Sequence, residues 1–80
     1  MKWILIPECV TYDEPETQIT FESDARDAAT LIYCYVKASE LIRRVHVFAE
    51  ESRFIFSRVD VLKNTHEFNS IMDHLGRGSF

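Results

Sequence analysis

Histidine and cysteine are the side chains in this sequence that could bind a metal ion or attack a substrate. They are His46, His66, His74, Cys9 and Cys34. Metal sites built from these residues use short ligand spacings, such as two histidines four residues apart or two cysteines two residues apart. No pair in the sequence has such a spacing. We therefore expect solvated histidines, no metal site and no cofactor.

The cysteines are also poor candidates for a nucleophile. Cys34 lies in the uncharged run from Ala28 to Val36, where a thiol behaves as a small hydrophobic side chain. A nucleophile needs a base and an oxyanion donor close by, and the neighbouring sequence supplies neither. We predict that Cys34 is buried, that both cysteines stay reduced in the cytoplasm, and that the protein is not an enzyme. A small enzyme or enzyme subunit is the last of three functional alternatives.

Four arginines in the second half of the chain form another group that could do chemistry. They are Arg43, Arg44, Arg53 and Arg58, with Phe54 and Phe56 between them. Arginine can bind phosphate while an aromatic ring stacks on a base, so a small nucleic-acid-binding module is the second functional alternative. Three acidic residues interrupt the group and the net charge of the chain is −4. A solvated charged face and an arginine-rich protein interface are the competing interpretations.

Acidic residues concentrate in one quarter of the chain. Between Glu8 and Asp27 there are seven acidic residues and one basic residue, whereas residues 28–80 contain six acidic and seven basic residues. Such a segment can be a solvated loop with charges that favour a helix start. It can also dock on a basic partner. The residues predicted to do so are Tyr12, Asp13, Glu14, Glu16, Glu22, Asp24 and Asp27.

The elements that position these groups follow from the apolar patterns. Alternating or continuous β-forming residues predict strands over 2–6, 17–22, 44–50 and 53–61, with Pro7 ending the first. Apolar residues at helical spacing predict helices over 24–38 and 65–75, the first capped by Ser23 or Asp24 and the second by Asn64. Gly76 suits the position after the second helix. A stripe from Leu41 to Leu62 with spacings of four and three leaves a single long helix as the alternative to the 44–61 hairpin.

Together the elements predict an α+β fold in the order ββαββα, with residues 1–80 as one domain and 77–80 as a flexible tail. We expect a four-stranded, mostly antiparallel sheet with two helices on one face. The helix over 24–38 is apolar almost all round, so its second face needs cover from this chain or from another. A homodimer through the apolar back of that helix is therefore possible.

The leading functional hypothesis is a non-enzymatic protein-binding module in the cytoplasm. No apolar run reaches the length of a membrane span, so no membrane partner is expected. The acidic segment would dock on a protein with a basic surface, such as a nucleic-acid-binding complex, and electrostatic attraction would speed association. Small inhibitors of this format include phage anti-defence proteins of the anti-CRISPR type, immunity proteins and antitoxins. The analogy to these inhibitors rests on the small size of the domain, its lack of catalytic motifs and its clustered acidic residues.

Overall fold

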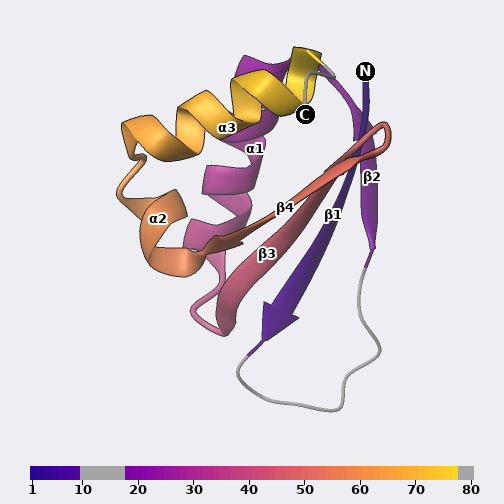
Figure 1. The fold of residues 1–80 in the computed structure, drawn as a ribbon. Helices are drawn as coiled ribbons and strands as arrows, with labels where there is room; N and C mark the ends of the chain where they lie inside the picture. Colours follow the sequence, from indigo (N-terminus) through magenta and orange to yellow (C-terminus); the bar gives the residue numbers. More distant parts are fainter. Residues whose placement is uncertain (10–17, 78–80) are drawn as a thin grey trace.

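The computed structural model of this chain describes residues 1–9 and 18–77. Its elements, in chain order, are β1 (Lys2–Cys9), β2 (Ile19–Glu22), α1 (Ala25–Ala38), β3 (Ile42–Ala49), β4 (Ser52–Ser57), α2 (Arg58–Leu62) and α3 (His66–Arg77). The strands form one antiparallel sheet in the order β2-β1-β3-β4. The helices lie on one side of this sheet (Figure 1). The predicted α+β class and the four-stranded antiparallel sheet are confirmed, while the predicted element order lacks the short helix α2.

The first strand is longer than predicted, since it does not end at Pro7 but continues through it to Cys9. β1 pairs with β2 only as far as Leu5, whereas its pairing with β3 continues to Cys9. Beyond Leu5, one side of β1 has no ladder partner among the described residues. A proline, which lacks the backbone N–H, is tolerated in a strand where one side is unpaired. Pro7 is buried and extends the core-facing row of β1.

The hairpin over 44–61 is confirmed, and the alternative of one helix through 41–62 is wrong. The second strand of the hairpin ends at Ser57, four residues earlier than predicted. The Ser57 hydroxyl accepts a hydrogen bond from the backbone N–H of Asp60 at 3.2 Å and caps α2. This cap outweighs the strand preference of the two valines that follow, because a short helix lets Val61 enter the core.

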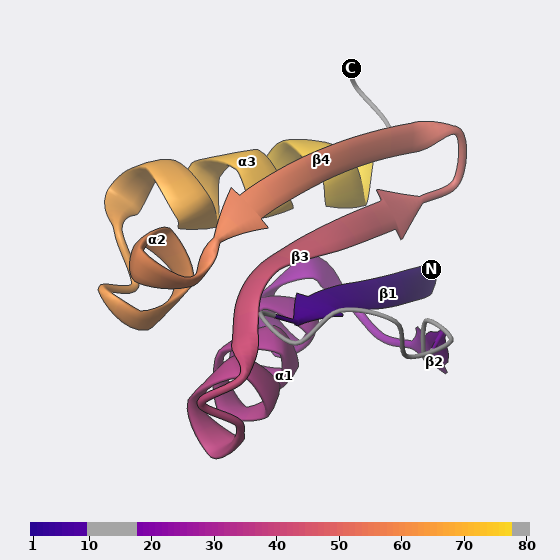
Figure 2. The ribbon, with the colours of Figure 1, turned by 90° about the horizontal axis from the view of Figure 1, so that it is seen from below.

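The core lies between the sheet and the helices. Alternate strand residues are buried beneath the helices. The strands rotate relative to one another from β1 to β4, as the view from below shows (Figure 2). Trp3 is fully buried, and its indole N–H donates to the carbonyl oxygen of Ser23 at 3.0 Å. Ile32 is the buried centre of the α1 stripe, as the spacing predicted. The largest fully buried side chains are Trp3, Phe68, Leu5, Ile32, Ile42, Met72, Leu75, Val36, Val45, Val47 and Val61.

The ends of the helices differ in detail from the sequence prediction. Asp24 caps α1 by accepting a hydrogen bond from the backbone N–H of Asp27 at 2.8 Å. Thr65, rather than Asn64, caps α3 through its hydroxyl, which accepts from the backbone N–H of Phe68 at 3.0 Å. Gly76 does not follow α3 as predicted but lies inside it. Residues 78–80, which belong to the predicted tail, lie outside the described residues.

Candidate functional site: the open face of the sheet

The helices cover one face of the sheet, and we call the other one the open face. Its residues are placed by the strand register, since side chains alternate between the two faces. One row across the sheet contains Thr20, Ile4, Phe48 and Arg53; the next contains Ile6, His46 and Ile55; the third contains Glu8, Arg44 and Ser57. Lys2 and Glu22 pair at the opposite end of the face from Glu8.

Large apolar side chains occupy the centre of the open face. Ile4, Ile6 and Phe48 are half-buried, and 43% of Ile55 is exposed to solvent. An antiparallel sheet with one solvated face usually carries polar residues on that face. Threonine would satisfy the strand preference there as well as isoleucine does. A contiguous exposed apolar patch on a small protein is characteristic of an interaction surface.

Charged side chains surround this apolar centre. At one end, Glu8 Oε2 lies 3.0 Å from His46 Nε2, and Glu8 Oε1 lies 3.4 Å from Arg44 Nε. The hydrogen bond with His46 and, to a smaller extent, the positive charge of Arg44 lower the pKa of Glu8 below its ordinary value of 4.5. Toward the other end, the Arg53 guanidinium lies 6.0 Å from the centre of the Phe48 ring. That contact orients the arginine over the aromatic face.

A shallow hollow lies at the Lys2 end of the open face. It is lined by Lys2, Ile4, Phe48 and Glu50, so Glu50, which follows β3, reaches the same surface as the central apolar residues. Glu50 has a φ of 54°, in the left-handed region. This conformation serves the tight turn between β3 and β4.

A β-bulge at the start of β3 places two consecutive arginines on the surface. Glu8 pairs with Arg44 while Cys9 pairs with Ile42, which leaves Arg43 as the extra residue. The bulge lets Ile42 and the core residue three positions later both be buried, while Arg43 and Arg44 are exposed. Simple alternation from Arg44 onward could not reveal this bulge, because the extra residue lies just before the predicted strand.

The four arginines predicted to bind nucleic acid do not lie on one surface. Arg43 and Arg44 lie at one end of the open face and Arg53 lies beside Phe48. Arg58 is elsewhere: its Nη1 donates to the carbonyl oxygens of Val36, Ser39 and Ile42, at 3.2, 2.6 and 2.9 Å. The aromatic partners also differ. Phe54 and Phe56 pack with the core, 4.9 Å apart between ring centres, and the aromatic ring on the open face is that of Phe48.

Three of the seven residues predicted to dock on a basic partner are described. Glu22, Asp24 and Asp27 are exposed and lie around the connection from β2 to α1. The Glu22 carboxylate is 3.9 Å from the N-terminal amino group and 79% of its side chain is exposed. Asp24 and Asp27 also serve the start of α1, as the competing interpretation requires. Tyr12, Asp13, Glu14 and Glu16 lie outside the described residues.

No described part of this chain covers the back of α1. Cys34, predicted to be buried, is exposed, and so is Cys9. Leu31, which also points away from the core, is 45% exposed. The prediction for Cys34 is wrong because α1 packs through a single stripe, and α3 lies beside α1 rather than across its back. Lys37 Nζ lies 5.6 Å from the centre of the Tyr33 ring and partly shields it.

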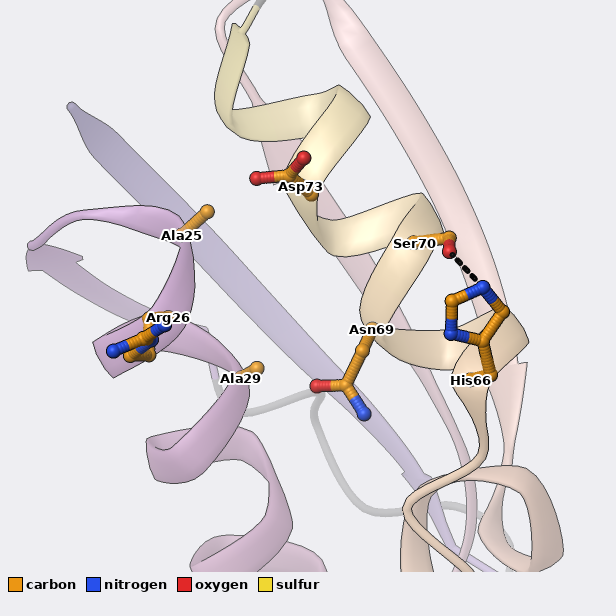
Figure 3. A pocket seen from close by; sticks show the side chains of 7 residues that line it. All are labelled: Ala25, Arg26, Ala29, His66, Asn69, Ser70 and Asp73. Carbon is orange, nitrogen blue, oxygen red and sulfur yellow. Dashed lines mark hydrogen bonds between the residues drawn. The ribbon is translucent and has the colours of Figure 1, made fainter.

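A groove of about 340 Å³ separates α1 from α3 (Figure 3). Its lining is a mixture of apolar and polar side chains from Ala25, Arg26, Ala29, His66, Asn69, Ser70 and Asp73. The Ser70 hydroxyl lies 3.3 Å from His66 Nε2, a pair that would need an acidic partner to act as a catalytic triad. Asp73 points toward α1 in Figure 3 and pairs with Arg77 of the same helix at 2.6 Å. The Ser70–His66 pair is exposed, and we assign it no catalytic role.

Within the part of the chain that the structure describes, no group of three or more histidine, cysteine, aspartate or glutamate side chains is arranged to hold a metal ion. Among residues 1–9 and 18–77, no helix combines the length and apolar character needed to cross a membrane. Comparison of the chain with protein-family models, curated proteins and solved structures found no match.

Proposed function

We propose that this protein is a non-enzymatic protein-binding module and that the open face is its docking surface. The observation that carries the proposal is the apolar centre of Ile4, Ile6, Phe48 and Ile55 on a sheet face that no helix of the described chain covers. An apolar centre inside a polar rim is the usual composition of protein interfaces. The free thiols of both cysteines support action in a reducing compartment such as the cytoplasm.

Charge favours a protein partner over nucleic acid at this face. The basic residues Lys2, Arg43, Arg44 and Arg53 exceed the acidic residues Glu8, Glu22 and Glu50 by only one. Nucleic-acid binding rests on a surplus of positive charge that can replace counterions along the phosphate backbone. Arg58 cannot add to the surplus without giving up its three carbonyl contacts. The nucleic-acid-binding module is therefore the weaker proposal.

Affinity purification from the native cells tests the docking surface. The baits are the unaltered chain, a Phe48→Ser variant of the open face, and a Leu31→Ser control on the back of α1. We expect proteins that co-purify in near-stoichiometric amount with the unaltered chain and the control to be lost with Phe48→Ser. Circular dichroism confirms that each bait is folded. The proposal is contradicted if the Phe48→Ser bait and an Ile55→Ser bait both retain every one of these proteins.

A second candidate is the acidic surface that includes Glu22, Asp24 and Asp27, acting as an inhibitor of a basic, nucleic-acid-binding complex. The observation that favours it is the exposure of all three carboxylates near one connection. Glu22→Lys leaves the Asp24 cap of α1 intact, although Glu22 also lies at the edge of the open face. If this surface docks, the variant should slow association about tenfold at low salt, with a smaller effect as ionic strength rises. An unchanged association rate for a folded Glu22→Lys variant argues against this candidate.

A further inference from the structure

We infer that a second copy of this chain occupies the open face, so that the two sheets pack face to face around a two-fold axis. The inference rests on the proposed function, since it names the partner for the same surface. The inference is supported by the order of charges along the two central strands, β1 and β3, and by the apolar residues between these charges.

Each central strand carries opposite charges at its two ends. β1 begins at Lys2 and reaches Glu8, while β3 contains Arg44 near its start and is followed by Glu50. Because β1 and β3 are antiparallel, each end of the face has one positive and one negative residue on adjacent strands. Glu8 and Arg44 are direct cross-strand partners, and Lys2 and Glu50 line the same hollow.

A two-fold axis parallel to the strands, between β1 and β3, places β1 over the β3 of the second copy. The Lys2 end of one open face then lies over the Lys2 end of the other. Lys2 then faces Glu50 of the second copy, and Glu8 faces its Arg44. The same rotation places β2 over the β4 of the second copy, so Glu22 approaches its Arg53. Each of these six charges then meets one of opposite sign. A two-fold interface needs this property, since the same patch is used on both sides.

The apolar residues of the open face match under the same rotation. Ile4 lies opposite Phe48 of the second copy, and by symmetry the contact occurs twice. Ile6 lies opposite His46 of the second copy in the neighbouring row. Paired sheets pack about 10 Å apart, at an angle of about 30°, through side chains of this size. The dimer would thus bury the apolar centre and keep the charged pairs at its rim, as in other specific interfaces.

The back of α1, the surface suggested for a dimer by the sequence, offers less. Its large exposed apolar side chain is Leu31, and Cys34 beside it is small. Thr30 and Lys37, also exposed, border them. A single leucine gives a smaller desolvated centre than the three isoleucines and the phenylalanine of the open face. We therefore assign the second copy to the sheet and treat the helix surface as the alternative that the experiment must distinguish.

Analytical ultracentrifugation of the purified full chain tests this inference. The chain has a mass of 9.4 kDa, so dimerisation doubles a small and well-defined value. Lys2→Glu should create repulsion with Glu50 of the second copy, and Glu50→Lys should create repulsion with its Lys2. Each variant alone should raise the dissociation constant of the dimer about tenfold or more at low salt.

Mixing the two variants is the decisive measurement. In a mixed dimer, the substituted Glu at position 2 of one chain meets the substituted Lys at position 50 of the other, and the natural pair remains at the opposite position. Equimolar Lys2→Glu and Glu50→Lys chains should therefore associate nearly as tightly as the unaltered chain. Fold defects within each chain cannot produce this rescue, because mixing does not repair them. Phe48→Ser, in contrast, should weaken the dimer without rescue by either variant.

Three results would overturn the inference. One is a monomeric unaltered chain at about 0.5 mM, a concentration at which even a weak dimer forms. Another is a dimer that the open-face variants leave intact and Leu31→Lys dissociates, which assigns it to the back of α1. The third is a loss of association without rescue on mixing. In each case, loss of a different co-purifying protein from the Phe48→Ser bait would still support the proposed docking surface, so the two failures are separable.

Discussion

Gly76 of α3 lies against Ala25 at the start of α1, and a Cβ atom at Gly76 would come within 2.6 Å of the Ala25 Cβ. Such an approach is well inside van der Waals contact, so the two helices can cross here only because position 76 carries no side chain. The indole ring of Trp3 is also close, with its Cζ2 at 3.7 Å from the same point. The glycine therefore sets how closely α3 can approach the start of α1.

Gly76→Ala should destabilise the protein, although alanine is the better helix former. Relief of the clash costs about 1–3 kcal/mol, and the gain in helix propensity returns at most about 1 kcal/mol. We expect a net loss of about 1 kcal/mol in the free energy of unfolding, measured by urea denaturation. The matched control is the double variant Gly76→Ala with Ala25→Gly, which restores the space. If the double variant is no more stable than Gly76→Ala alone, the contact is not the cause.

Ile32 at the centre of the α1 stripe should contribute strongly to stability. It is fully buried, and Ile32→Ala leaves a cavity in a closely packed core. We expect a loss of about 2–4 kcal/mol in the free energy of unfolding. Leu31→Ala, on the exposed neighbour, should change it by no more than about 0.5 kcal/mol. A loss below about 1 kcal/mol for Ile32→Ala would mean that the stripe repacks or faces solvent.

The sequence was sufficient for the elements whose signals are local. The Asp24 cap and the spacing of Ile32 and Val36 place α1 correctly within one residue. The β-forming residue types correctly favour the hairpin over the single long helix that the heptad stripe indicates. Prediction from the sequence was wrong where contacts between distant parts of the chain determine the structure. Pro7 remains in β1 because the ladder with β2 ends first, and Cys34 is exposed because none of the elements within residues 1–9 and 18–77 packs across the back of α1.

The candidate site was less predictable than the fold, for a similar reason. Alternation places Ile4 with Ile6 on one face of β1 and Phe48 with His46 on one face of β3, but both faces of these strands are apolar and only the register shows that the two sets share a face of the sheet. Only the packing of the helices decides which face is covered. The role of Arg58 was also hidden, because its three carbonyl partners lie 16 to 22 residues earlier in the chain.

Arg58 should be the most important arginine for stability. Its guanidinium donates to three carbonyl oxygens at the end of α1 and at the start of β3, although the Val36 oxygen also accepts from the backbone N–H of Ser39. Arg58→Met keeps the apolar stem and removes the donors, and we expect it to cost about 2–3 kcal/mol in the free energy of unfolding. Arg43→Met makes the same change of charge at an exposed residue and should cost at most about 0.5 kcal/mol. Equal effects of the two variants would show that Arg58 acts through net charge.

Glu8 should make stability depend on pH in the acidic range. Its folded pKa is lowered by the hydrogen bond with His46 and the charge of Arg44, so the unfolded chain binds the proton more readily than the folded chain. The ionised carboxylate therefore stabilises the fold above about pH 5, and this contribution is lost as the pH falls through 4.5 and then through the lower folded value. Because the ion pairs are about half exposed, the contribution should be no more than about 1 kcal/mol.

Urea denaturation of the unaltered chain and Glu8→Gln at pH 5.5 and pH 3 tests this expectation, at a protein concentration low enough to keep both chains monomeric. The unaltered chain should be the more stable at pH 5.5, and the difference should shrink toward zero at pH 3. Glu67→Gln, an exposed carboxylate on α3, controls for the general loss of negative charge and should show a smaller change between the two pH values. A difference between the unaltered chain and Glu8→Gln that stays constant with pH would mean that Glu8 stabilises the sheet through packing rather than through its charge.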